Sequence, residues 1–251
     1  MQLAGRVAFL TGAGSGIGRA GALALAREGA IVTVTDLDGT RARAVADEIR
    51  AAGGTAEGLA LDAGDDAAVT AAIGAVAARG RLDILHSHAG IQLPGRLTEI
   101  GPDAMDASWR LNVRAHFVAA RAAMPQMQRQ KKGSIIITAS NSGVQYDRGM
   151  IAYCTTKHAV IAMTRQIAVD YAADNIRCNA LCPGFVDTPF NRGFEAQMGG
   201  RTALESYVAQ SIPMGRWASE TEIAESIVYL ASDRSAFMTG HALVIDGGEC
   251  L

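Results

Sequence analysis

Short apolar segments alternate along this chain with longer Ala-rich amphipathic segments. The first two apolar segments are RVAFLT at 6–11 and IVTVTD at 31–36, and helical patterns follow them at 17–28 and 39–52. A repeated order of strand, helix and strand indicates parallel strands, because a strand that returns in the same direction needs a crossover connection. The chain is therefore predicted to form an α/β fold, a doubly wound parallel sheet with helices on both faces.

The same alternation continues toward the C-terminus. Further strands are predicted at TAEGLAL, LDILHS, SIIITAS, IRCNALC and HALVID. SIIIT shows no polar alternation, as expected for a strand that is covered on both faces. The chain has 251 residues, 49% of them hydrophobic, and no Pro/Ser-rich linker, so we expect one domain over 1–251. The stretch at about 185–214 lacks a strong period and is expected to form a flexible flap over a site.

Composition and charge exclude several kinds of partner. The formal net charge is -2 and the longest basic run is Lys131–Lys132, so no basic field attracts nucleic acid. The apolar run at 7–10 is too short for a membrane span or a secretory signal, and we expect no membrane contact and a cytoplasmic protein. The cysteines show no C-x-x-C spacing and are interpreted as small core residues: Cys154, Cys178, Cys182 and Cys250.

A glycine cluster, TGAGSGIG, joins the first predicted strand to the first helix. Gly12, Gly16 and Gly18 allow the backbone to approach a phosphate closely. The helix N-terminus adds free N–H groups and the positive end of the helix dipole. The cluster therefore predicts a pyrophosphate site, and an ordinary glycine-rich turn is the alternative interpretation.

Asp36 ends the second predicted strand, about twenty residues after the glycine cluster, where a carboxylate can accept both hydroxyls of an adenosine ribose. Its charge would repel a 2'-phosphate, and neither Ser15 nor Leu37 compensates that charge. Arg41 and Arg43 are interpreted as part of a solvated helix face. NAD(H) is therefore predicted in preference to NADP(H), with a simple turn role for Asp36 as the alternative.

The segment YCTTK, at 153–157, opens the helix after SIIITAS. Tyr153 and Lys157 are four residues apart and so share one helix face. A free phenol has a pKa of about 10, and a cation within about 4 to 6 Å lowers that pKa. Lys157 is therefore predicted to make Tyr153 an acid and base near neutral pH, although an amphipathic packing pair would give the same spacing.

Taken together, these motifs resemble the short-chain dehydrogenase/reductase (SDR) family over essentially the whole chain. The resemblance rests on TGAGSGIG, Asn112, Ser140 thirteen residues before Tyr153, YCTTK, NALCPGFVDTP and the terminal VIDGG. It implies a Rossmann-type fold with a seven-stranded parallel sheet, usually in a homotetramer. It also implies that NAD(P) lies across the carboxyl ends of the strands.

The resemblance also implies what individual residues do. Tyr153 would exchange the proton with the substrate oxygen that Ser140 holds, and Lys157 would also bind the nicotinamide ribose. Asn112 would hold a water that relays the proton. Tyr153 is implied to contact the cofactor as well, and the other implied cofactor contacts are Gly12, Ser15, Gly16, Ile17, Gly18, Asp36, Asp62, Ala63, Ala89, Gly90, Pro183, Gly184 and Thr188.

The chain departs from the family where NNAG is replaced by SHAG, Ser87–Gly90. Loss of the amide puts the anchoring of the strand end and the nicotinamide-ribose contact in doubt, because an asparagine amide bonds to neighbouring backbone. His86 and His88 share one face of a predicted strand, but no third ligand follows at a suitable spacing, so we predict no metal site.

The predicted function is an NAD(H)-dependent oxidoreductase that interconverts a secondary alcohol and a ketone. A sugar- or polyol-derived hydroxy compound is the first hypothesis for the substrate; a 3-oxoacyl compound, a cyclic diol or a steroid stays open. Two other classes are weighed: a non-catalytic dinucleotide-binding scaffold, and a lyase or epimerase with a bound nucleotide-sugar. Substrate contacts are expected from 92–96 and the flap, and from Asn141, Ser142, Gln145, Arg148, Phe185, Phe190 and Met198.

Overall fold

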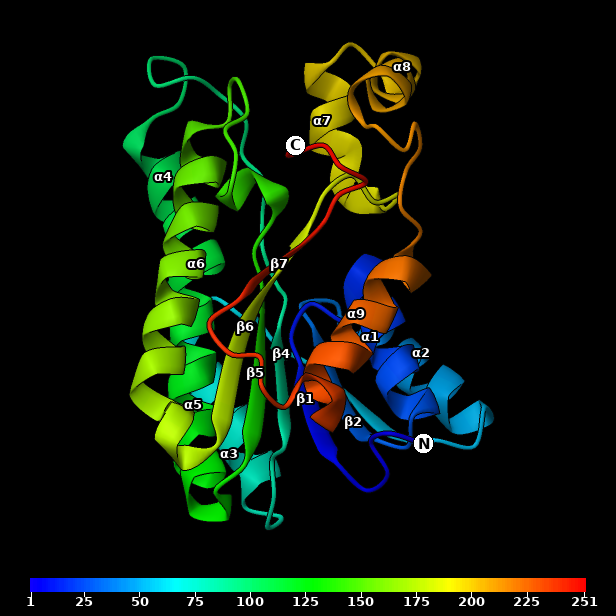
Figure 1. Cartoon of the computed structure of the whole chain (residues 1–251), viewed down its shortest axis with the longest axis vertical. Coiled ribbons are helices and arrows are strands. Elements are labelled where there is room, and N and C mark those ends of the chain that lie inside the picture. Colours follow the sequence, from blue (N-terminus) through cyan, green and yellow to red (C-terminus); the bar gives the residue numbers. More distant parts are fainter.

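A seven-stranded, fully parallel sheet forms the centre of the computed structural model, which describes residues 1–251 (Figure 1). The strand order is β3-β2-β1-β4-β5-β6-β7, and each neighbouring pair runs parallel. This confirms the predicted doubly wound fold. The strands are β1 (Val7–Leu10), β2 (Ile31–Asp36), β3 (Thr55–Ala60), β4 (Ile84–Ser87), β5 (Gly133–Thr138), β6 (Ile176–Pro183) and β7 (Ala242–Ile245).

Helices cover both faces of this sheet (Figure 1). One face carries α1 (Gly16–Arg27), α2 (Gly39–Ala51) and α9 (Glu220–Ala231). The other carries α3 (Asp66–Ala77), α4 (Pro102–Trp109), α5 (Ala115–Gln130) and α6 (Ile151–Tyr171), with a π-helical segment, Arg110–Arg114, between α4 and α5. The short helices α7 (Arg192–Gln197) and α8 (Arg201–Ser211) lie beyond the carboxyl ends of the strands.

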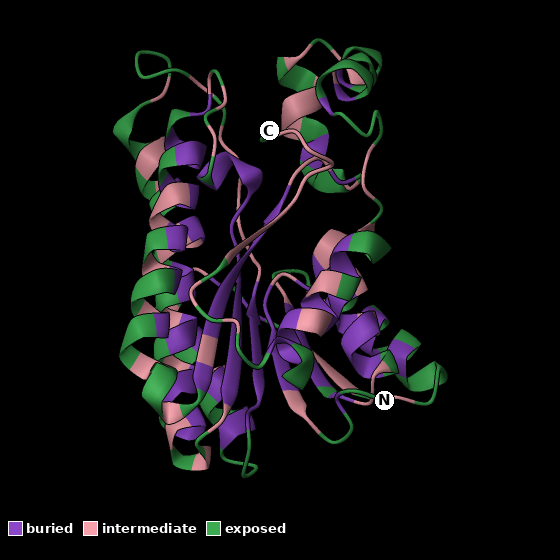
Figure 2. Cartoon of the chain, viewed as in Figure 1, coloured by how far each residue is buried: buried purple, intermediate pink, exposed green.

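Most of the apolar core lies in two clusters, one on each face of the sheet. Figure 2 shows the central strands buried between the helix layers, and every residue of β4 and β5 is buried. Burial on both faces explains why these strands carry no polar alternation. No helix of the structure is both long enough and apolar enough to cross a membrane.

The strand order reverses between β1 and β4, so the loops that leave these two strands part from each other and open a crevice. Gly12 follows β1, with φ of 64°, and Ala89 follows β4. A Cβ atom on Gly12 would lie 2.9 Å from Cα of Ala89. Only glycine therefore lets the two loops meet at this point.

The chain after β6 differs in two ways from what the sequence indicated. The stretch at about 185–214 contains α7 and α8, which the periodicity missed because α7 has six residues and none of them is buried, while its role as a flexible flap stays a prediction. Cys250 was expected in the core but is exposed in the tail after β7, whereas the other three cysteines are buried free thiols.

Candidate active site

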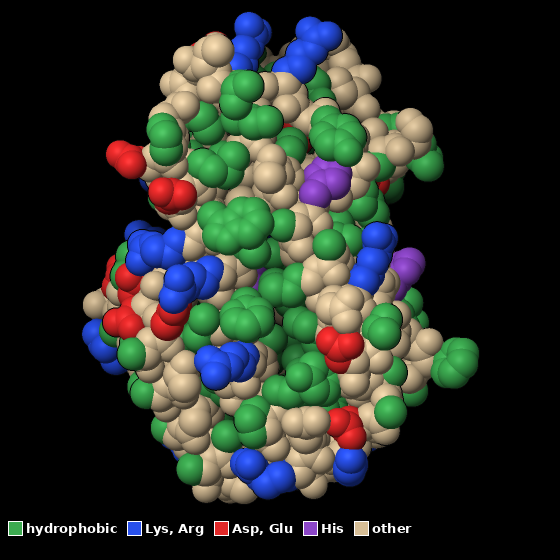
Figure 3. Space-filling view, turned by 90° about the vertical axis from the view of Figure 1, so that its left-hand side faces the viewer, with side chains coloured by type: hydrophobic (Ala, Val, Ile, Leu, Met, Phe, Trp, Pro, Cys, Tyr) green, Lys and Arg blue, Asp and Glu red, His purple; other side chains and the backbone are tan.

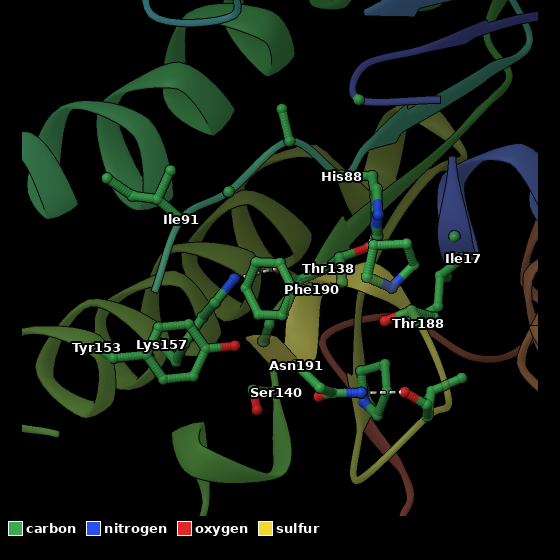
Figure 4. A pocket seen from close by; sticks show the side chains of 18 of the residues that line it. Ile17, His88, Ile91, Thr138, Ser140, Tyr153, Lys157, Thr188, Phe190 and Asn191 are labelled. Carbon is green, nitrogen blue, oxygen red and sulfur yellow. Dashed lines mark hydrogen bonds between the residues drawn. The ribbon is translucent and has the colours of Figure 1, made fainter. Parts of the chain in front are cut away.

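A cavity of about 360 Å³ lies at the carboxyl ends of the strands (Figure 4). It runs from the glycine turn after β1 past the ends of the central strands to the helical segment after β6. Sixteen of the predicted site residues line it: Gly12, Ser15, Gly16, Ile17, Asp36, Asp62, Ala63, Ala89, Gly90, Ser140, Ser142, Tyr153, Lys157, Pro183, Gly184 and Thr188.

Several other predicted residues do not line this cavity. Gly18 and Asn112 are buried beside it, while Gln145 and Arg148 lie outside it because the loop before α6 turns Asp147 inward instead. Of the predicted apolar wall, Phe185 and Phe190 line the cavity and Met198 does not.

The glycine turn presents backbone groups to the cavity. Ser15 precedes α1 and makes no side-chain capping hydrogen bond, so the first-turn N–H groups of α1 remain for another acceptor. A Cβ atom on Gly18 would lie 2.2 Å from the carbonyl oxygen of Gly12. Gly18 therefore allows the helix to pack under the turn, and its contact with the cofactor stays a prediction.

Acidic side chains stand at the end of the cavity next to this turn. Asp36 accepts the N–H of Gly14 at 2.9 Å and that of Asp38 at 3.0 Å. A carboxylate has about four acceptor positions, so Asp36 retains capacity for ribose hydroxyls. Asp62 accepts the N–H of Gly64 at 2.8 Å. The open turn and these carboxylates fit the adenosine and pyrophosphate parts of a dinucleotide.

Tyr153 and Lys157 project from one face of α6 into the cavity, and both are buried. Nζ of Lys157 lies 5.5 Å from the ring centroid of Tyr153 and donates a hydrogen bond to the carbonyl oxygen of Thr138 at 3.0 Å. Figure 4 shows the Tyr153 hydroxyl, Nζ of Lys157 and Oγ of Ser140 in the same part of the cavity, with the Phe190 ring nearby. A substrate oxygen in this part of the cavity would meet a phenol, a hydroxyl and an ammonium.

The proton affinities of this pair differ from the prediction. Burial raises the pKa of Tyr153 above its ordinary value, against the effect of the neighbouring Ser140 hydroxyl, and the negative charge of Asp147 raises it further. Burial lowers the pKa of Lys157 to about 8. The predicted net lowering of the phenol pKa is therefore wrong for this structure, because desolvation is the largest cause of the shift and raises the pKa.

Asn112 lies in the π-helical segment and is fully buried. Its Oδ1 accepts the N–H of Ile91 at 2.8 Å, and its Nδ2 donates to the carbonyl of Ile91 at 2.9 Å and to the Thr156 hydroxyl at 3.1 Å. Both amide hydrogens are thus used within the protein. The side chain anchors the segment after β4, and the water contact stays a prediction.

The SHAG segment retains anchoring contacts despite the loss of the asparagine amide. Ser87 forms a hydrogen bond with Nδ1 of His116 at 2.7 Å. His88 and His86 both form hydrogen bonds with the Thr138 hydroxyl, at 3.0 and 2.9 Å, which tie the end of β4 to β5. Burial lowers the pKa of His88 to about 4, so this side chain is neutral at pH 7. No cluster of three or more His, Cys, Asp or Glu side chains is arranged to hold a metal.

Two cavity carboxylates were missed from the sequence. Asp147 accepts a hydrogen bond from the Ser142 hydroxyl, and Glu249 accepts one from Nδ2 of Asn141 at 2.8 Å. Burial raises the pKa of Glu249 to about 7. Asp147 lies between two predicted substrate contacts, Gln145 and Arg148, but nothing in the spacing marks it, and Glu249 follows VIDGG with no pattern of its own.

The chain is similar to known proteins over almost its whole length. The family described as enoyl-(acyl carrier protein) reductase matches residues 12–249. A 2-keto-3-deoxy-L-fuconate dehydrogenase from Xanthomonas campestris is 40% identical, over 98% of this chain and 81% of its own. A 2-(S)-hydroxypropyl-CoM dehydrogenase from Xanthobacter autotrophicus is 37% identical, over 98% and 97%.

The chain is also similar to a solved structure over almost its whole length. A gluconate 5-dehydrogenase from Burkholderia cenocepacia, in complex with NADP and tartrate, superposes with a TM-score of 0.92. It is 33% identical to this chain and the match covers 99% of this chain and 96% of that one.

Proposed function

The chain belongs to the short-chain dehydrogenase/reductase family, and from that premise we propose that it is an NAD(H)-dependent oxidoreductase that interconverts a secondary alcohol and a ketone. The observation that carries the proposal is the convergence of Ser140, Tyr153 and Lys157 in one cavity with the open glycine turn. The relatives named as dehydrogenases of sugar acids support a sugar- or polyol-derived substrate.

The cofactor half of the proposal rests on the fit of the cavity to a dinucleotide. The first turn of α1 would hold the pyrophosphate, and Asp36 the adenosine ribose. The related gluconate 5-dehydrogenase holds NADP, which does not favour NAD. NAD is preferred here because Asp36 places a carboxylate at this end of the cavity, and because Nε of Arg41 lies 3.3 Å from Oδ2 of Asp38, outside the cavity. Nicotinamide, when bound, supplies or accepts the hydride.

Side chains of α6 and of the segment after β5 would carry out the proton transfer. In ketone reduction the Tyr153 hydroxyl gives its proton to the substrate oxygen and becomes a phenolate, and in alcohol oxidation the phenolate takes the proton of the alcohol. When substrate binds, the Ser140 hydroxyl would turn from Oδ1 of Asn141 to the same oxygen, donate its hydrogen bond there and stabilise the developing negative charge. Lys157, with a pKa of about 8, is still mostly charged at pH 7 and stabilises the phenolate that reduction leaves behind.

The exposed face of α4, α5 and α6 bears on the oligomeric state. We infer that residues 1–251 act as one domain and that the protein forms a homotetramer, as relatives of this family usually do. The face covered by α4, α5 and α6 carries apolar side chains among charged ones (Figure 3). Trp109, Phe117 and Val169, one on each of these helices, are exposed in the single chain. Their burial in an assembly would be favourable.

A spectrophotometric screen tests the proposed reaction. Polyols, sugar acids, hydroxyacids and cyclic diols are offered with NAD or NADP, and the absorbance of the reduced nicotinamide is followed. We expect turnover of at least one secondary alcohol, faster with NAD. If dinucleotide binds but no member of the panel reacts with either cofactor, the scaffold alternative replaces the proposed activity.

A further inference from the structure

The end of the cavity away from the glycine turn is organised by one chain of hydrogen bonds. The Ser142 hydroxyl donates to Asp147 and lies 3.3 Å from the Ser140 hydroxyl. Ser140 in turn donates to Oδ1 of Asn141 at 3.1 Å, and Nδ2 of Asn141 donates to Glu249 at 2.8 Å. Ser140, which the proposed reaction needs at the substrate oxygen, therefore lies between two carboxylates.

Glu249 lies in a hydrogen-bonded turn that follows β7. Asp246 accepts the N–H of Gly248 at 2.9 Å and that of Cys250 at 2.8 Å, which closes the tail into a turn. A Cβ atom on Gly184 would lie 2.7 Å from Cβ of Asp246 and 3.4 Å from Oε2 of Glu249. The tail is thus packed against the segment after β6, and glycine at 184 leaves the space that it occupies.

Cations that could bind an acidic substrate are scarce in this cavity. Lys157 is the only lysine or arginine among the lining residues, and its Nζ is bonded to the Thr138 carbonyl beside Tyr153. Arg148, which was expected to bind an acid, is exposed and outside the cavity. A carboxylate on the substrate would meet Asp147 and Glu249 without a cation to pair with, and the like charges would repel each other.

From these contacts we infer that the substrate is a neutral polyhydroxylated alcohol or ketone, whose hydroxyl groups donate to Asp147 and Glu249, and that Glu249 sets the preference against sugar acids. Hydroxyl groups suit this end of the cavity because each carboxylate keeps acceptor positions free after its one or two protein contacts. The inference rests on the proposed function, since it assigns the substrate class of the same site.

A positively charged amino alcohol is the competing class, because two carboxylates would also attract a cation. The neutral class is favoured because uncharged donors already stabilise both carboxylates without a counter-ion. These donors are Ser142 and Cys154 on Asp147, and Asn141 and Tyr207 on Glu249. The raised pKa of Glu249, about 7, also leaves this group partly uncharged at neutral pH. Loss of part of this charge weakens the attraction of the site for a cation.

Binding measurements on matched ligands test the inference. Alditols of four to six carbons, the aldonates of the same skeletons and the corresponding 1-amino-1-deoxyalditols are titrated calorimetrically into the full chain saturated with NADH at pH 8. We expect an alditol to bind at least about tenfold more tightly than its aldonate, and Glu249→Gln to reduce this ratio about fivefold by removing one charge. Glu225→Gln is the matched control, since Glu225 is an exposed partner of Arg27 outside the cavity.

Three results would overturn the inference. They are tighter binding of an aldonate or an amino alditol than of the alditol, an equal alditol-to-aldonate ratio in Glu249→Gln and Glu225→Gln, and no binding of any member of the three sets. The absorbance screen distinguishes these results from failure of the proposed function. Turnover of a different alcohol would leave the dehydrogenase assignment standing while the polyol class is rejected.

Discussion

The two ends of the cavity are built from different kinds of group. The cofactor end consists of a glycine turn, a helix N-terminus and a strand-end carboxylate that follow one another within residues 12–36. The substrate end consists of side chains from segments far apart in the chain, as the contact between Asn141 and Glu249 shows. A site made of backbone is specified by local spacing, whereas a site made of side chains depends on which segments meet.

The largest effect is expected where the two ends meet, at Tyr153. Tyr153→Phe removes the proton-exchanging hydroxyl and keeps the ring, so turnover should fall by about a thousandfold or more while dinucleotide affinity is unchanged. Stopped-flow turnover and calorimetric titration of NADH measure the two quantities. Tyr171→Phe, on the same helix and outside the cavity, serves as control. Residual turnover above one tenth would remove Tyr153 from the proton step.

The backbone character of the cofactor end is tested at Gly18. In Gly18→Ala the new methyl group has no room beside the carbonyl of Gly12, so we expect dinucleotide affinity to fall at least about tenfold and the melting temperature to drop. Gly74→Ala in α3 is the control, because no atom lies within 4 Å of its Cβ position. That variant should gain up to about 1 kcal/mol in stability from helix propensity. Equal dinucleotide affinities in Gly18→Ala and Gly74→Ala would show that the packing of Gly18 does not shape the cofactor end.

Charge at the cofactor end is tested at Asp36. Asp36→Asn keeps the shape of the side chain and removes the repulsion of a 2'-phosphate, so the affinity for NADP relative to NAD should rise about tenfold. The Michaelis constant of the alcohol should stay unchanged, since Asp36 lies at the other end of the cavity. Asp106→Asn, on the exposed side of α4, is the control. An unaltered NADP/NAD ratio in dissociation constants would exclude Asp36 from cofactor selection.

Charge at the substrate end is tested by pH. Glu249 is protonated below its pKa of about 7 and negative above it, so discrimination of alditols against aldonates should increase a few-fold from pH 6 to pH 8. Asp147, Asp246, Asn141 and Tyr207 face this carboxyl group, and its desolvation is the largest cause of the raised pKa. Affinity ratios measured across this range should lose their pH dependence in Glu249→Gln. A constant ratio in the unaltered protein would contradict the assignment.

The smallest effect is expected from Gln145 and Arg148, the two predicted substrate contacts that lie outside the cavity. Gln145→Ala and Arg148→Ala should each change kcat/KM by less than about twofold, because neither side chain lines the cavity. The measurement is steady-state kinetics on the best alcohol from the screen. A tenfold loss of kcat/KM for a sugar acid in Arg148→Ala would show that this arginine moves inward on binding.

Much of the fold and of the cofactor end was predictable from the sequence. The strands could be found because burial on both faces demands continuous apolar runs, and the glycine turn because its glycines directly follow such a run. The helices α7 and α8 could not be found, since short helices with few buried positions leave little periodicity. Glu249 could not be found because its partner Asn141 is more than one hundred residues away in the chain.

By itself, the sequence determined the parallel sheet, its crossover helices and the open turn at the start of α1, because each depends on spacing within a few consecutive residues. The tertiary structure alone decided the charge at the substrate end and the proton affinities of Tyr153 and Lys157. The physical reason is that desolvation and the field of neighbouring charges depend on what surrounds a group in space. The same phenol and lysine, exposed on the surface of a helix, would keep nearly their ordinary pKa values.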